Sequence, residues 1–273
     1  KAWAGTFQAV GQFTHLLQDM AQPQHVRNDV HLSPSESLDL LFPDWSRYER
    51  YTLANIKGLT YTGYPTANAT VNLPDYRSYW IGAGKGLAEF TNGNFVSEHT
   101  NFVGGQAGSG SYSSPDLGAT TETTDTLPIA LDVKGDPIKD PNGVPYSNIQ
   151  VRYKGNTFTD AYTAAPAANP KLSTYSMFDF IHKTYVGTDV FSLNNDNHQA
   201  YADILIPRAV GYSAGLINYF FRGKMQISLP DEGIYAIVDH SVEKAIDVSG
   251  FRQIKLKLAN TTPGEAMGVG DLV

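Results

Sequence analysis

The sequence predicts an α+β protein because the spacing of apolar residues changes along its 273 residues. Apolar residues recur at helical spacing over 3–22 and again over 197–222, whereas from Met225 onward they alternate, as they do in strands. An apolar fraction of 41% against 17% charged residues is typical of a folded chain. We therefore expect a mainly helical domain over 1–223 and a small β unit over 224–273.

The helical domain is expected to begin with an amphipathic helix over 3–22. A short helix is expected around 45–56, and another near 83–92, where several glycines obscure its start. Helical character returns at 174–185 and is strongest at 197–222.

The last of these helices has recognisable end and packing signals. Asn195 or Asp196 is expected to cap its start, and Pro207 is expected to kink it. Three small residues should allow a close neighbour: Gly211, Ala214 and Gly215.

An insertion is expected at about 104–172. Residues 104–127 form a Gly/Ser/Thr-rich tract, which we interpret as a mobile surface loop rather than a ligand-binding loop. Residues 128–134 and 147–154 alternate apolar and polar, and a turn signal at 140–143 separates them. This pattern predicts a β-hairpin.

The carboxy-terminal unit should contain three or four strands, from alternating runs at 226–229, 234–238 and 254–258. The apolar face of so small a sheet must pack against another element to be stable, and open strand edges favour pairing with a neighbouring chain. A homo-oligomer or fibre is therefore one expected assembly.

Composition narrows the function classes. The net charge of −7 disfavours a sequence-independent nucleic-acid binder, which needs a basic face. The chain has no cysteine, so disulfides and thiolate metal sites are excluded. Its 16 tyrosines and 25 glycines suggest a secreted or cell-surface protein. The longest weakly polar run, 209–221, is too short for a transmembrane segment.

The stretch from His15 to His25 carries the strongest chemical signal. His15 and Asp19 are four residues apart and share one face of a helix. Pro23 is expected to end that helix, so that His25 can turn back toward the same region. Imidazole nitrogen and carboxylate oxygen are ordinary zinc ligands.

A structural interpretation of these residues stays open. The helix has an apolar stripe, and His15 and Asp19 lie on the opposite side, where they could form an exposed ion pair. The stripe consists of Trp3, Phe7, Val10, Phe13, Leu17 and Met20.

The pattern H-x-x-x-D-x-x-x-P-x-H resembles the zinc-binding helix of the zinc-dependent phospholipase C and P1/S1 nuclease superfamily. This resemblance implies a mainly helical fold in which up to three zinc ions hydrolyse phosphodiester or phospholipid substrates. It implies that His15, Asp19 and His25 bind zinc, with Asp19 bridging two ions. Glu49 is a further implied ligand, from a His-x-x-x-Glu pair of the family.

The chain also departs from the family pattern. Trp45 stands where the family has the histidine paired with Glu49, and the ligands that precede this helix in the family are absent from a chain that begins at Lys1. We therefore expect a fragment that binds fewer zinc ions or none, unless a second polypeptide supplies the missing ligands. No catalytic residue is assigned.

Two functions follow as alternatives. The first is a zinc-dependent phosphodiester hydrolase, active or degenerate. The second is a non-catalytic extracellular structural or assembly protein built on that scaffold and completed by strand addition. The remaining histidines are expected to be structural or exposed: His31, His99, His182, His198 and His240.

Overall fold

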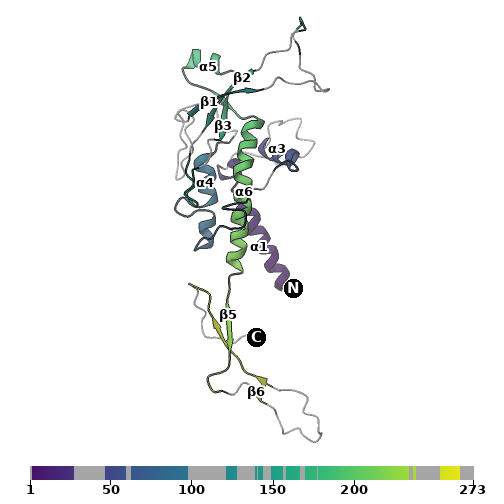
Figure 1. Cartoon of the computed structure of the whole chain (residues 1–273), viewed down its shortest axis with the longest axis vertical. Helices are drawn as coiled ribbons and strands as arrows, with labels where there is room; N and C mark the ends of the chain where they lie inside the picture. Colours follow the sequence, from purple (N-terminus) through teal and green to yellow (C-terminus); the bar gives the residue numbers. More distant parts are fainter. Residues whose placement is uncertain are drawn as a thin grey trace. The chain divides into compact units, whose positions relative to one another are not determined.

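The computed structural model describes twelve parts of the chain and has a mixed α+β architecture (Figure 1). The described residues are 2–27, 47–59, 63–97, 121–127, 139, 141–143, 149–155, 158–166, 170–176, 178–233, 236–237 and 253–264. The chain divides into two compact units, Lys1–Ile217 and Asn218–Val273. Among the described helices, none has both the length and the apolar composition that crossing a membrane requires.

Five described helices of the first unit lie close to predicted ranges: α1 (Ala2–Asp19), α3 (Arg47–Asn55), α4 (Leu87–Asn94), α5 (Asp179–Val186) and α6 (Asn195–Phe220), which crosses the boundary between the units. Two short helices were not predicted, α2 (Pro23–Val26) and the 3₁₀ helix η1 (Tyr76–Tyr79).

Helix α1 differs from its prediction in two ways. It ends at Asp19, and Pro23 begins the separate helix α2, because proline fits the first helical turn, where no N–H partner is required. The apolar stripe also does not form a continuous buried face. Leu17 is fully buried, but Trp3 is 69% and Phe7 59% exposed.

A four-stranded antiparallel sheet completes the first unit, with strand order β1-β2-β3-β4. Its strands are β1 (Thr121–Leu127), β2 (Ile149–Gly155), β3 (Lys171–Tyr175) and β4 (Phe191–Ser192). Strands β1 and β2 pair in register from Thr121 opposite Gly155 to Leu127 opposite Ile149.

Two predictions in this region were wrong. Strand β1 occupies the end of the tract expected to be a loop, because its four threonines are β-branched and favour extended backbone. Residues 171–175 form β3 rather than the start of a helix, and α5 begins only at Asp179. The expected strand at 128–134 and the rest of the tract, 104–120, lie outside the described residues.

Helix α6 runs through the middle of the first unit, with α4 on one side and α1 and α3 on the other (Figure 1). Tyr201 on this helix packs edge-on against Phe95, at a ring-centroid distance of 5.0 Å, and against Tyr48 of α3 at 6.0 Å. Its hydroxyl donates to the carbonyl oxygen of Leu172 in β3 at 2.6 Å. Tyr201 therefore joins α3, the end of α4 and the sheet in one core.

The predicted close packing of α6 is confirmed. A Cβ atom added at Gly211 would lie 2.3 Å from the backbone oxygen of Tyr64, and one at Gly215 would lie 2.0 Å from that of Val71. The predicted cap was displaced by one residue, since the side chain of Asn194 accepts hydrogen bonds from the first backbone N–H groups of the helix. The helix continues through Pro207.

In the described residues of the second unit, the strands form two separate antiparallel pairs and not one small sheet. Strand β5 (Met225–Ser228) pairs with β8 (Lys257–Asn260), and β6 (Ala236–Ile237) pairs with β7 (Gln253–Ile254). All four residues of β5 are exposed.

Candidate metal centre and a neighbouring cavity

The structure brings all four predicted metal ligands together. Helix α1 contributes His15 and Asp19, α2 contributes His25, and α3 contributes Glu49. The two carboxylate oxygens of Asp19 face different imidazoles. Its Oδ2 lies 3.8 Å from His15 Nε2, and its Oδ1 lies 3.8 Å from His25 Nδ1. On the other side of the His25 ring, Nε2 lies 3.2 Å from Glu49 Oε1.

Local sequence explains how His25 reaches Asp19. After α1, the backbone N–H of Gln22 donates to the Asp19 carbonyl oxygen at 3.0 Å, which closes a tight turn. Pro23 then starts α2, and the His25 N–H donates to the Gln22 carbonyl oxygen at 3.1 Å. The proline therefore acts as a helix start, and it still turns His25 toward α1.

Contacts outside the cluster hold α2 in place. The Arg27 guanidinium donates to the carbonyl oxygen of Asn92 at 2.9 Å and to that of Phe95, both at the end of α4. Carbonyl groups at a helix end lack partners within the helix, so a guanidinium is a suitable donor to them. This attachment fixes the residue two positions after His25 and so restricts where the imidazole can lie.

The start of α4 is organised by the carboxylate of Glu89. Glu89 Oε2 accepts hydrogen bonds from the backbone N–H groups of Gly82, Gly84 and Gly86, at 2.8, 3.0 and 3.0 Å. Glu89 therefore closes the glycine-rich loop before α4 and has a structural role.

Burial within the four-residue cluster increases from α1 toward α2. The side chain of His15 is 74% exposed, that of Asp19 24% and that of His25 18%. His15 thus remains at the surface, as the structural interpretation of the helix expects, while Asp19 and His25 are largely screened from water.

The spacing of the donor atoms can be compared with the geometry of zinc. Two ligand atoms, each about 2.0–2.1 Å from one tetrahedral ion, stand roughly 3.3 Å apart. The His25–Glu49 pair has this spacing already, and the two pairs at Asp19 are wider by about half an ångström. In the part of the chain that the structure describes, no three such side chains already form one coordination shell.

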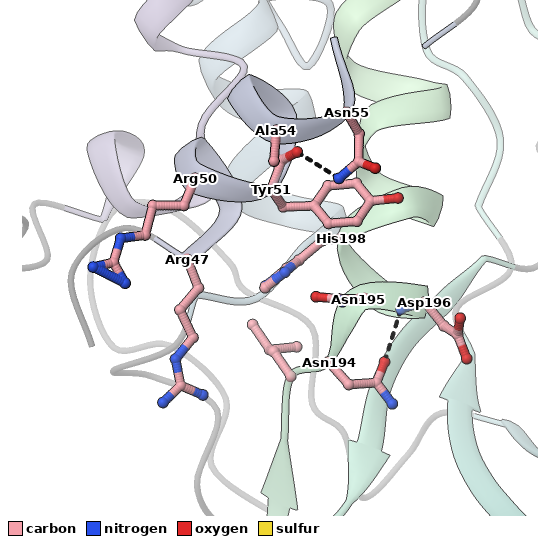
Figure 2. Close-up of a pocket in the computed structure, with 10 residues that line it drawn as sticks. Arg47, Arg50, Tyr51, Ala54, Asn55, Asn194, Asn195, Asp196 and His198 are labelled. Atoms are coloured by element: carbon pink, nitrogen blue, oxygen red, sulfur yellow. Dashed lines mark hydrogen bonds between the residues drawn. The ribbon is translucent and has the colours of Figure 1, made fainter. Parts of the chain in front are cut away.

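A cavity of about 650 Å³ lies next to this cluster, between α3 and the start of α6. Figure 2 shows its lining side chains. The described lining residues come from α3 and from the segment that leads into α6: Arg47, Arg50, Tyr51, Ala54, Asn55, Leu193, Asn194, Asn195, Asp196 and His198.

The imidazole of His198 is the most enclosed polar group of this lining, with 3% of the residue exposed. It packs between two tyrosines of α3, with ring centroids 6.0 Å from Tyr48 and 5.8 Å from Tyr51. Burial is the main cause that raises the pKa of both tyrosines above the ordinary value of 10.0, so both hydroxyls remain protonated at neutral pH.

The sequence interpretation missed this cavity. It assigned His198 a structural or exposed role and gave none to Arg47 or Arg50. The spacing of the two arginines, three residues apart on a short helix, was the available signal for a shared cationic face.

The other predicted histidines divide into two groups. His182 is structural, since its Nδ1 donates to the Thr188 carbonyl oxygen at 2.9 Å beyond the end of α5. The remaining three, and Trp45, lie outside the described residues: His31, His99 and His240.

No protein-family model, curated protein or solved structure matches this chain.

Proposed function

We propose that His15, Asp19, His25 and Glu49 bind zinc, and that the chain is a secreted or cell-surface zinc-dependent phosphodiester hydrolase of the phospholipase C or nuclease type. The observation that carries the proposal is the position of Asp19. Its two carboxylate oxygens face imidazoles from two separate segments, each at 3.8 Å. This is the arrangement that a carboxylate shared by two ions requires.

The fit of these residues to zinc rests on their donor chemistry. Imidazole nitrogen and carboxylate oxygen are ligands that zinc accepts in catalytic sites. Each ring nitrogen of His25 faces a carboxylate, Nδ1 that of Asp19 and Nε2 that of Glu49.

Bound zinc would polarise a phosphoryl oxygen and lower the pKa of a coordinated water toward about 7. The chain itself supplies the ligands, and it restricts their positions through the attachment of α2 to α4. The exposed side of the cluster, at His15, leaves room for a substrate to approach.

Metal analysis after zinc loading and desalting tests the metal site. We expect about one zinc ion or more per chain, and His25→Ala should lower that content sharply. His182→Ala is the matched control, because His182 is also partly buried but its imidazole hydrogen-bonds Thr188, just beyond the end of its own helix. Equal zinc content in wild type and His25→Ala would refute the site.

Activity needs a separate measurement. Zinc-loaded protein should hydrolyse bis(p-nitrophenyl) phosphate, and chelation should abolish that hydrolysis. If the protein binds zinc at His25 but hydrolyses no phosphodiester, the proposed metal site stands and the proposed hydrolase activity is refuted.

A second candidate function is favoured by the second unit. Strand β5 is exposed along its whole length, and its apolar residues Met225 and Ile227 are 53% and 62% exposed. Exposed apolar strands are rare in monomers, since they pair with other chains. We therefore keep the assembly protein as the alternative, with self-association through this strand as its defining property.

A further inference from the structure

Helix α5 presents its apolar side to solvent. At about 100° per residue, four exposed side chains of this helix fall within one arc of about 140°: Phe180, Ile181, Thr184 and Tyr185. Phe178, which precedes the helix, is exposed as well. We call these five residues the α5 patch. An amphipathic helix normally buries such a side against its own domain.

Polar side chains of the opposite side hold α5 in this orientation. The buried carboxylate of Asp179 accepts hydrogen bonds from the Val190 N–H at 2.8 Å and from the Arg152 guanidinium of β2 at 3.0 Å. Lys183 Nζ pairs with Asp189 at 2.6 Å. Figure 1 shows α5 next to β2 at one end of the first unit, where the Arg152–Asp179 pair joins them. Turning the patch inward would break these contacts.

The α5 patch is large enough to form an interface. Its three aromatic residues, Phe178, Phe180 and Tyr185, are 62%, 81% and 84% exposed, and Ile181 is 56% exposed. Because an aromatic side chain can bury about 150–250 Å², the patch leaves roughly 500 Å² of accessible surface. Two such surfaces in contact would bury roughly 1,000 Å², which reaches the lower limit for a specific interface.

We propose that the α5 patch is a contact between two copies of this chain. The patch contains no lysine, arginine, aspartate, glutamate or histidine. A surface without charge is complementary to itself, as a contact across a two-fold axis requires. Aromatic residues are enriched and charged residues are depleted at the centre of protein interfaces, and the α5 patch has this composition.

A lipid surface fits the α5 patch less well. Helices that bind at a bilayer surface usually carry several lysine or arginine residues that attract anionic lipids. Helix α5 has eight residues, and its one lysine, Lys183, is paired with Asp189. A second copy of the chain needs no such attraction.

The proposed contact is distinct from self-association through β5. Helix α5 belongs to the first unit and β5 to the second. A contact across one two-fold axis closes a dimer, whereas two different contacts on one chain can build a longer assembly. The experiment therefore removes the β5 contact first, with Ile227→Lys.

Sedimentation velocity of the full chain carrying Ile227→Lys measures the α5 contact alone. We expect a concentration-dependent dimer of twice the chain mass of 29.8 kDa. Tyr185→Glu and Ile181→Glu, each added to this chain, should weaken the dimer about a hundredfold or more, because each dimer would then bury two carboxylates in an apolar contact. Leu53→Glu is the matched control, since Leu53 is 74% exposed on α3 and lies outside the patch.

The phenylalanine variant separates the apolar contact from the tyrosine hydroxyl. Tyr185→Phe keeps the apolar surface, so the dimer should persist in it while both glutamate variants lose it.

Three results would overturn the proposal. The first is a chain with Ile227→Lys that stays monomeric up to its solubility limit. The second is a dimer that both glutamate variants leave intact while their circular dichroism matches the parent chain. The third is a monomer that cosediments with phosphatidylcholine vesicles and no longer does so with Tyr185→Glu, which would assign the patch to lipid.

Discussion

Substituting Gly215 by alanine tests whether α6 holds the first unit together as the structure shows. The added Cβ would lie 2.0 Å from the Val71 backbone oxygen and 2.9 Å from Cε1 of the Tyr79 ring. A carbon atom normally stays more than 3 Å from such an oxygen, so the helix or the Val71 segment must move by about an ångström or more. The obstacle is backbone, which cannot rotate away.

The expected magnitude is the difference of two opposing effects. Alanine is favoured over glycine inside a helix by about 0.8–1.0 kcal/mol. Overpacking a close contact costs about 1–3 kcal/mol, and a backbone obstacle places Gly215→Ala toward the upper end of that range. We therefore expect a net loss of about 1–2 kcal/mol in the free energy of unfolding.

A matched glycine separates the two effects. Gly5 lies inside α1, and a Cβ there meets no described atom within 4 Å. Gly5→Ala should therefore gain up to about 1 kcal/mol from helix propensity alone. In a unit of this size, 1 kcal/mol shifts the Tm by about 2–4 °C, so thermal unfolding resolves both changes. Stabilisation by both variants would refute the close approach at Gly215.

Two further predictions concern acid stability and assembly. Burial by itself raises the pKa of Asp160, but the Thr163 N–H and the Arg208 charge outweigh it and hold that pKa below 3.8. The stability that this carboxylate contributes is therefore complete above its pKa in the unfolded chain, and it is lost as the pH falls through its pKa in the folded chain. The urea concentration at the unfolding midpoint should fall below about pH 4 in wild type, and it should fall less steeply in Asp160→Asn. If exposed β5 mediates self-association, Ile227→Lys should lower the mass measured by light scattering at high concentration, and an unchanged mass would exclude that strand.

The sequence predicted the helices of the first unit well, because their hydrophobic period is local information. It misjudged which residues of α1 would be buried. Leu17 is fully enclosed, whereas Trp3 and Phe7 belong to the same stripe and remain exposed. An apolar stripe predicts which face of a helix can be buried. How much of that face packs against other elements depends on tertiary contacts, which a local pattern does not contain.

Strand boundaries were harder to predict for a different reason. The threonines of β1 belong to a tract whose composition predicted a loop, yet they form a strand. Its partner, β2, follows more than twenty residues later in the sequence. Strand propensity is decided largely by the neighbour on which a strand packs. Because that neighbour is distant in the sequence, composition alone predicted a loop over residues 121–127.

The same distinction separates the two candidate sites. His15 and Asp19 could be paired from the sequence because helix geometry fixes residues four apart, and the turn at Pro23 adds His25 within the same segment. The cavity, by contrast, places Arg50 and His198 together from positions nearly 150 residues apart. No spacing rule connects such residues, and only the packing of α3 on α6 brings them to one wall.

Helix α3 is the element that relates the metal cluster to the cavity. Glu49 contacts His25 from one face, while Arg47 and Arg50 line the cavity from the other. Side chains on opposite faces of a helix do not compete for one ligand, so substitutions at the arginines should leave the zinc content unchanged, whereas substitution of His25 should lower it. Their coupling would have to pass through the position of the helix itself, which Tyr48 fixes against Tyr201 in the core. An arginine substitution that alters zinc affinity would therefore be evidence that α3 moves as a body.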